Sequence, residues 1–164
     1  MQQMGRRLSG ATDVALLALR LAAGSIMALH GWTKFDQGLA KYRGFLDFLN
    51  LPLPSVLEYV IPTLELVGGI LIVLGLITRV PALLLAIEMI CTAVIVKLVK
   101  LDLGILGPQG VGGAEVDLLY LGSFIALLIL GPGRISLDRA FGIETYDATP
   151  AAAAESTPAM RTTV

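Results

Sequence analysis

Four long apolar stretches run along the chain, separated by short segments rich in polar residues, glycine or proline. A membrane-spanning helix needs roughly 20 mainly apolar residues, because the hydrocarbon layer is about 30 Å thick and a helix rises about 1.5 Å per residue. The apolar runs are unbroken rather than alternating, which favours helices over the strands of a barrel. The stretches are Val14 to Trp32, Val56 to Leu76, Val80 to Val99 and Val116 to Leu130. They predict an all-α fold, a bundle of four transmembrane helices.

The connecting segments differ in character. Lys34 to Ser55 mixes aromatic and charged residues, which predicts an interfacial amphipathic helix ended by Pro52 and Pro54. The turn Ile77 to Arg79 is so short that the second and third helices must be antiparallel neighbours. Leu101 to Glu115 contains many glycines and is predicted to be flexible or to fold back as a re-entrant segment.

Composition supports a single membrane domain. Hydrophobic residues make up 55% of the chain and charged residues 15%, and the mean hydropathy is +0.80. We expect a cytoplasmic N-terminal segment of residues 1–13, a membrane domain of residues 14–142 and a disordered tail of residues 143–164. Ala151 to Val164 has too few apolar side chains to pack.

The first apolar stretch could instead be a secretory signal with Arg6 and Arg7 as its charged start. Arg20 interrupts the apolar run and no small-residue cleavage site follows it, so a retained helix is the simpler interpretation. The basic residues balance between the two sides, so the positive-inside rule does not decide the orientation. Because Arg6 and Arg7 precede the first helix, we expect both termini on the cytoplasmic side of a bacterial cytoplasmic membrane.

Charge and cysteine content argue against several classes of site. The net charge is −1 and the basic residues are scattered, so no nucleic-acid surface is indicated. Cys91 is the single cysteine, and no Cys/His set has zinc spacing. A metal site built from His30, Glu58 and Glu115 would rest on one histidine, so we predict none.

Arg20, Glu65 and Glu88 lie away from the ends of the apolar stretches, and charges at bilayer depth normally face the bundle interior and pair. Counted from one side at the helical rise, Arg20 lies near 10 Å, Glu65 near 16 Å and Glu88 near 13 Å. We therefore expect a buried ion-pair cluster in which Arg20 pairs with Glu65, Glu88 or both. In one interpretation, such a pair is purely structural and determines which helices touch. Alternatively, one of two adjacent carboxylates would hold a proton, as quinone chemistry or proton-coupled transport requires.

A second polar layer is expected near the opposite membrane surface. Its members are His30, Lys34, Glu58, Glu115 and Asp117. Small residues on the first two helices offer surfaces for close helix packing. They are Gly24 and Ala28 on the first helix, and Gly68, Gly69 and Gly75 on the second.

Several motifs occur in an order that resembles the DoxX family of small bacterial membrane proteins. They are Leu19-Arg20-Leu21, His30-Gly31-Trp32-Thr33-Lys34, Glu65-Leu66-Val67-Gly68-Gly69, Gly112-Gly113-Ala114-Glu115 and the closing Gly131-Pro132-Gly133-Arg134-Ile135-Ser136-Leu137-Asp138. The resemblance implies a four-helix membrane bundle associated with respiratory or oxidative-stress redox chemistry. It also implies polar family positions at Arg20, His30, Lys34, Glu65, Glu115 and Asp138. Glu88 lies outside this pattern.

Three functions are compatible with these features. The first is a non-catalytic membrane subunit or anchor of a redox complex, which contacts quinone or other membrane-associated redox proteins. The second is a quinone-reactive oxidoreductase subunit with Glu65 or Glu88 as proton acceptor and His30 as quinone ligand. The third is a small solute or proton transporter, which we rank last because no inverted repeat is visible. Quinone is the one cofactor that these hypotheses invoke.

Overall fold

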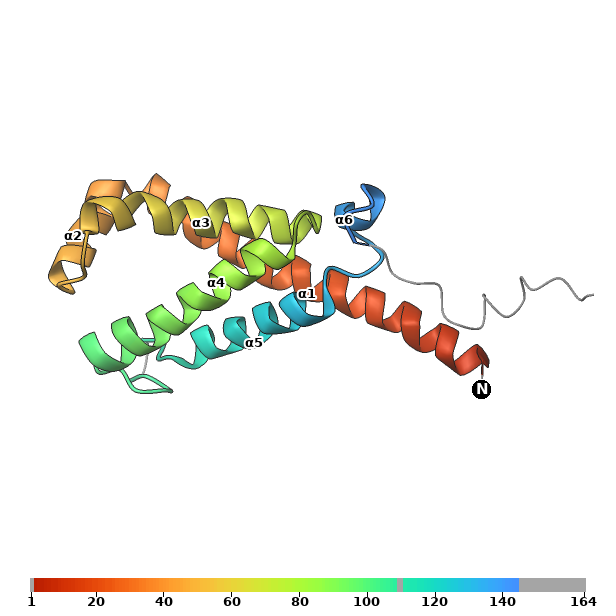
Figure 1. Cartoon of the computed structure of the whole chain (residues 1–164). Coiled ribbons are helices and arrows are strands. Elements are labelled where there is room, and N and C mark those ends of the chain that lie inside the picture. The colour runs from red at the N-terminus through yellow and green to blue at the C-terminus, as the bar shows by residue number, and fades with distance from the viewer. Residues whose placement is uncertain (1, 109–110, 145–164) are drawn as a thin grey trace, which may run out of the picture.

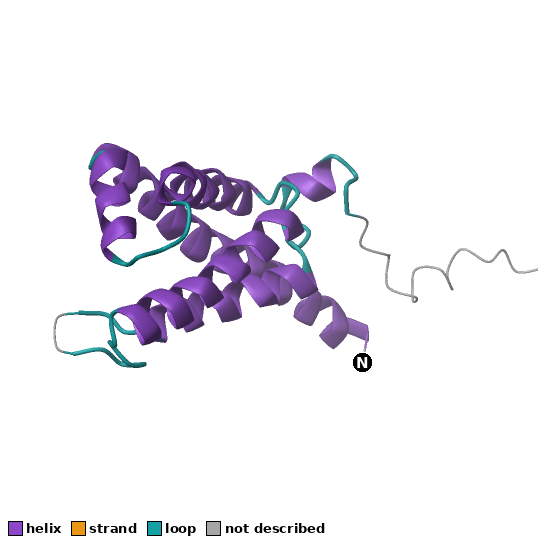
Figure 2. Cartoon of the chain, turned by 60° about the vertical axis from the view of Figure 1, so that its left-hand side comes forward, coloured by secondary structure: helices purple, strands orange, loops and turns teal. Residues whose placement is uncertain are grey.

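The regular elements of the described chain are all helices (Figures 1 and 2). The computed structural model describes residues 2–108 and 111–144. The helices are α1 (Gln2–Asp36), α2 (Leu39–Phe48), α3 (Pro54–Leu74), α4 (Arg79–Cys91), the π-helix η1 (Thr92–Lys100), α5 (Glu115–Leu130) and α6 (Leu137–Ala140). The all-α prediction is confirmed for these residues. Residues 145–164, which hold most of the predicted tail, lie outside them.

Three helical segments are long and apolar enough to cross a membrane: Gly10–Asp36, Pro54–Leu74 and Arg79–Lys100. Helix α5 has 16 residues and is therefore about 24 Å long, shorter than the other three. Each predicted span coincides with a helix, but α1 already begins at Gln2, so residues 2–13 continue the first span as helix. Large apolar side chains remain exposed along these helices, as a lipid-facing surface requires.

The long helices form two pairs. Helix α1 packs along α3, and α4 packs along α5; the turn between α3 and α4 joins the pairs (Figure 1). A Cβ added at Gly24 would lie 2.8 Å from the carbonyl oxygen of Gly69, and one added at Gly69 would lie 2.5 Å from the amide nitrogen of Ala28. The close approach predicted from these small residues is confirmed.

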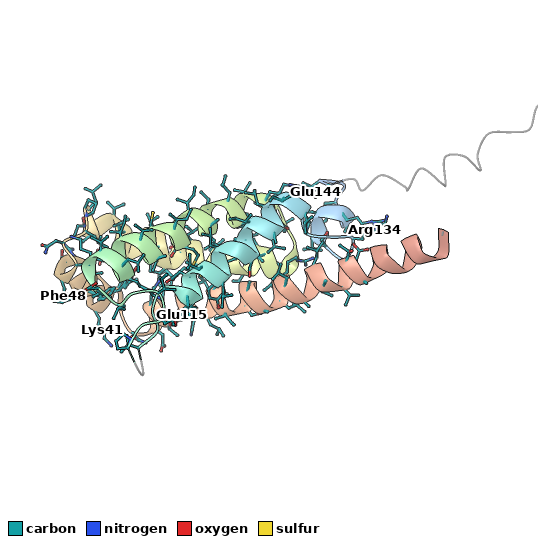
Figure 3. All side chains as sticks on the ribbon, turned by 90° about the horizontal axis from the view of Figure 1, so that it is seen from below. Lys41, Phe48, Glu115, Arg134 and Glu144 are labelled. Carbon is teal, nitrogen blue, oxygen red and sulfur yellow. The ribbon has the colours of Figure 1, made fainter. Side chains whose placement is uncertain are left out.

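Helix α2 covers one end of the bundle, where it contacts α3 and α1 (Figure 1). Its Leu46 side chain and the following Leu49 are buried, whereas Phe48 is exposed, so the amphipathic prediction is confirmed over a shorter range. Pro54 belongs to the first turn of α3, where a missing amide proton costs nothing. Lys41, Phe48 and Glu115 lie at this end of the molecule, and Arg134 and Glu144 lie at the other (Figure 3).

Candidate functional site

A cavity of about 240 Å³ lies near the α2 end of the bundle and is lined by residues from α1, α2, α3, α4, η1 and α5. Its apolar wall includes Met27, Leu46, Met89 and Val96. Its polar lining consists of His30, Lys34, Tyr42, Glu65, Glu88, Thr92, Lys97, Asp117 and Tyr120. Polar groups from separate helices thus converge on one apolar pocket, the usual arrangement of a small-molecule site.

Lys34 and Glu65 form the central ion pair of the cavity. The Lys34 Nζ lies 2.5 Å from each carboxylate oxygen of Glu65, and the Glu65 side chain is only 6% exposed. Lys34 lies in the last turn of α1, and the same ammonium group lies 4.9 Å from the ring centroid of Tyr42. The pair therefore ties α1 to α3, and the cation–π contact draws α2 onto them.

Glu88 approaches the same pair from α4. Its carboxylate interacts with that of Glu65, and Glu88 is 9% exposed. The Oε2 atom of Glu88 is buried and has no hydrogen-bond partner among the described residues. A buried carboxylate oxygen normally accepts at least one hydrogen bond, so Glu88 is a lining residue with an unused acceptor.

Tyr42 contributes the phenol that sequence analysis did not single out. Burial raises the pKa of Tyr42, and the nearby carboxylates of Glu65 and Glu88 raise it further. The hydroxyl therefore keeps its proton at neutral pH. None of the hydrogen bonds found within the described residues involves it, so it is available as a donor. The aromatic residues of the predicted amphipathic segment did not reveal which one would face inward.

A second ion pair, between Lys97 and Asp117, belongs to the cavity lining. Lys97 Nζ lies 2.7 Å from Asp117 Oδ2 and donates to the carbonyl oxygen of Gly113 at 2.7 Å. Lys97 belongs to η1, whose π-helical turns change the direction in which its side chains project. Lys97 was not predicted as a site residue, because its place in the cavity depends on this local geometry.

The predicted outer polar layer divides into two groups. His30, Lys34 and Asp117 line the cavity together with Glu65 and Glu88, which were expected in a separate cluster. Glu58 lies outside the lining and pairs with Arg43 at 3.7 Å, and Glu115 accepts a hydrogen bond from the amide of Gly113. Part of the layer therefore lines the cavity, and part of it makes local contacts elsewhere.

Arg20 has a different role from the one expected. Its guanidinium donates to the carbonyl oxygens of Ile72, Val73, Pro132 and Ile135 at 2.7–2.9 Å. The expected pairing of Arg20 with Glu65 or Glu88 is therefore wrong. The cation that pairs with Glu65 is Lys34. The depth count failed because it set Val14 level with Leu76; α1 instead extends past the end of α3, and Arg20 lies beside the last turn of α3 (Figure 1). Ile72 is seven residues beyond Glu65, about 10 Å along the helix.

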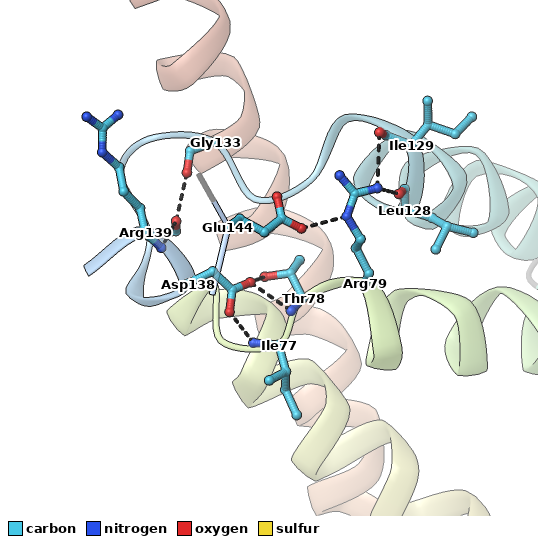
Figure 4. Close-up of polar contacts among 10 residues, drawn as sticks. Ile77, Thr78, Arg79, Leu128, Ile129, Gly133, Asp138, Arg139 and Glu144 are labelled. Atoms are coloured by element: carbon cyan, nitrogen blue, oxygen red, sulfur yellow. Dashed lines mark hydrogen bonds and ion pairs between the residues drawn. The ribbon is translucent and has the colours of Figure 1, made fainter. Parts of the chain in front are cut away.

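The closing motif forms a second polar cluster at the far end of the bundle (Figure 4). Asp138 accepts hydrogen bonds from the amide of Ile77 at 2.5 Å and from the amide and hydroxyl of Thr78 at 3.0 and 2.9 Å. Arg79 pairs with Glu144 at 2.5 Å and donates to the carbonyl oxygen of Leu128. Asp138 is 1% exposed. These contacts cap the start of α4 and fix the chain after α5, so this end is structural.

Comparison with known proteins agrees with the fold and the motifs. The DoxX family profile matches residues 15–98, and the chain belongs to the DoxX family. It is 35% identical to CatD of Bacillus subtilis, whose name describes it provisionally as an oxidoreductase, over 77% of this chain and 86% of CatD. It is 33% identical to the inner membrane protein YphA of Escherichia coli, over 79% of this chain and 91% of YphA.

A further relative is the uncharacterized membrane protein Rv3486 of Mycobacterium tuberculosis, which is 35% identical over 76% of this chain and 80% of its own length. No solved structure matches the chain. The family, the apolar helices and the names of two relatives agree that this is a membrane protein.

Proposed function

We propose that the protein is a membrane subunit of a quinone-linked redox system and that its cavity binds the ring of a quinone-class ligand. The observation that carries the proposal is the convergence of two hydrogen-bond donors, the Tyr42 hydroxyl and the Lys34 ammonium group, on a pocket with apolar walls. A ring carbonyl needs such a donor, and the ring itself needs apolar contacts. The cavity is smaller than the roughly 300–1,000 Å³ of pockets for drug-sized ligands, which suits a headgroup whose tail stays in lipid.

A partner protein completes this proposal. The sequence contains one cysteine, Cys91, and one histidine, His30, so it provides neither a dithiol nor a pair of histidines for haem. Electrons would therefore pass to or from a centre on another protein. The name of CatD supports a link between this type of chain and oxidoreduction.

The proposal includes a topology of four spans, with α5 as the fourth. Helix α5 is short, but it packs along α4, and Phe124 and Leu127 on it are fully buried. Four spans place both ends of the membrane domain on one side, which we propose to be the cytoplasm. Reporter fusions after Lys34 and after Arg139 should report opposite sides; the same side for both would contradict four spans.

The binding proposal is tested by titrating the full-length protein in lipid nanodiscs with duroquinone and, anaerobically, with duroquinol. Tyr42→Phe removes the hydroxyl but keeps the ring over Lys34, so affinity for at least one form should fall by about tenfold. Tyr59→Phe is the matched control, because Tyr59 is exposed and outside the cavity lining. Absence of binding by both forms, with empty nanodiscs as the blank, would overturn the proposal.

The partner proposal needs a separate experiment. Purification in a mild detergent, followed by mass spectrometry of co-purifying proteins and lipid-soluble molecules, should recover a redox protein and a quinone. Recovery of the quinone alone, after in-cell crosslinking as well, would favour the hypothesis of a self-contained quinone-reactive subunit.

A further inference from the structure

The buried carboxylate of Glu88 bears on the redox form of the ligand. Glu88 is 9% exposed, lines the cavity and has a buried Oε2 atom without a hydrogen-bond partner among the described residues. Both oxygens of the neighbouring Glu65 accept from Lys34. Lys34 thus donates to Glu65, and the Oε2 atom of Glu88 has no donor among the described residues.

The charges around the cavity strengthen this requirement. Two lysines, Lys34 and Lys97, face three acidic residues, and each lysine is already paired, with Glu65 and with Asp117 respectively. Glu88 is the acidic residue of this set without its own cation. A proton shared between Glu65 and Glu88 would occupy one of the acceptor positions of the two groups, and a carboxylate has about four. Acceptor capacity therefore remains on Glu88, a residue of the cavity lining.

From this geometry we infer that Glu88 accepts a hydrogen bond from a hydroxyl group of the bound ring, so that the cavity binds the quinol in preference to the quinone. The inference rests on the proposed function, since it specifies which form of the quinone-class ligand is held. A quinone offers only carbonyl oxygens, which would face the Glu88 carboxylate as a second acceptor. A quinol offers a donor to Glu88 at one side of the ring and can still accept from Tyr42 at the other.

The preference is measured as a ratio of dissociation constants. Equilibrium dialysis of the full-length protein in nanodiscs, under anaerobic conditions, should give at least about tenfold tighter binding of duroquinol than of duroquinone. A tenfold preference raises the midpoint potential of the bound two-electron couple by about 30 mV relative to the free couple. A redox-inert pair, tetramethylphenol and its methyl ether, should show the same preference for the hydroxyl-bearing compound.

Glu88→Gln tests the residue itself. A glutamine side chain replaces one acceptor oxygen by an amide donor, so the ratio should fall to near one or reverse in favour of duroquinone. Glu58→Gln is the matched control, because Glu58 is also buried on a long helix but lies outside the cavity lining; its ratio should equal that of the unaltered protein.

The outcomes separate the inference from the proposed function. Equal binding of both forms by the unaltered protein would overturn the inference and leave the quinone site standing, and this result needs no variant that folds. Binding of neither form would overturn both. An unchanged preference in a folded Glu88→Gln variant would assign the discrimination to another residue and overturn the role of Glu88.

Discussion

Lys34 Nζ contacts both carboxylate oxygens of Glu65 at 2.5 Å, across 31 residues of sequence and between the end of α1 and the middle of α3. The pair is mostly removed from solvent, with side-chain exposures of 23% for Lys34 and 6% for Glu65. Both residues line the cavity, and Lys34 also contacts the Tyr42 ring through the cation–π contact. One contact thus links the packing of three helices to the geometry of the candidate site.

Removing one member of this pair should cost more than removing both. Lys34→Met leaves the Glu65 carboxylate buried without its cation, which should lower the free energy of unfolding by roughly 3 kcal/mol. Combining it with Glu65→Gln should recover part of that loss, because no uncompensated charge then remains. Thermal unfolding of the purified variants measures the effect. Lys41→Met is the control, since Lys41 is exposed and its ammonium group bonds only Gln37 among the described residues. Additive losses in the double variant would contradict the pairing.

Lysine should not be able to replace arginine at position 20. Its guanidinium serves four carbonyl oxygens on α3 and the closing loop, and the single ammonium group of a lysine cannot reach them all. Arg20→Lys should therefore lower stability by about 2 kcal/mol or more, despite the retained charge. Arg139→Lys, at an exposed position, should have little effect. Since Arg20 binds carbonyls, Glu65→Gln should not rescue Arg20→Met; a clear rescue would restore the pairing expected from sequence.

The contact between α1 and α3 depends on the absence of side chains. Gly24→Ala places a methyl group 2.8 Å from the Gly69 carbonyl oxygen, so the helices must separate, at a cost of roughly 1–3 kcal/mol. Gly122→Ala is the matched control on α5, because nothing lies within 4 Å of its added Cβ. It should be neutral or stabilise the helix by up to about 1 kcal/mol. Equal melting temperatures for the two variants would contradict the close approach.

Most of the fold follows from hydropathy, because apolar runs of this length have few alternatives to helices in a membrane. The predicted spans and the helices agree closely at Val80 and at Val116, where glycine and polar residues mark the ends. The start of α1 could not be predicted in the same way. Helical hydrogen bonding continues through the polar residues before Val14, and hydropathy measures only the apolar part.

The site was harder to predict than the fold. Glu65 and Glu88 were expected to be neighbours because charged groups at depth must face the interior, whereas His30, Lys34 and Asp117 were assigned to a separate layer; the cavity instead brings members of both groups together. The partner of Glu65 was wrong, since the choice depended on helix register. Tyr42 and Lys97 were missed for a similar reason: the short helix α2 and the π-helix η1 direct them toward the cavity, and neither orientation is encoded in a regular sequence period.

Tyr42 should make stability depend on pH in the alkaline range. Burial, aided by the charges of Glu65 and Glu88, raises the pKa of Tyr42 above its ordinary value of about 10. The unfolded chain then loses the phenol proton near pH 10 while the folded protein keeps it. The contribution of this group is therefore complete below pH 10 and declines as pH rises toward the folded-state pKa.

The comparison with Tyr42→Phe isolates this effect, because other groups that titrate at high pH are common to both proteins. The stability of the unaltered protein relative to Tyr42→Phe should be constant between pH 7 and 9. Above pH 10 it should fall by up to about 1.4 kcal/mol per pH unit. Denaturant unfolding at a series of pH values measures the difference. Tyr59→Phe, at an exposed position, is the control variant and is measured in parallel. A difference that stays flat to pH 11 for Tyr42→Phe would mean that the phenol ionises as it does in water, and the donor role assigned to it in the cavity would lose its support.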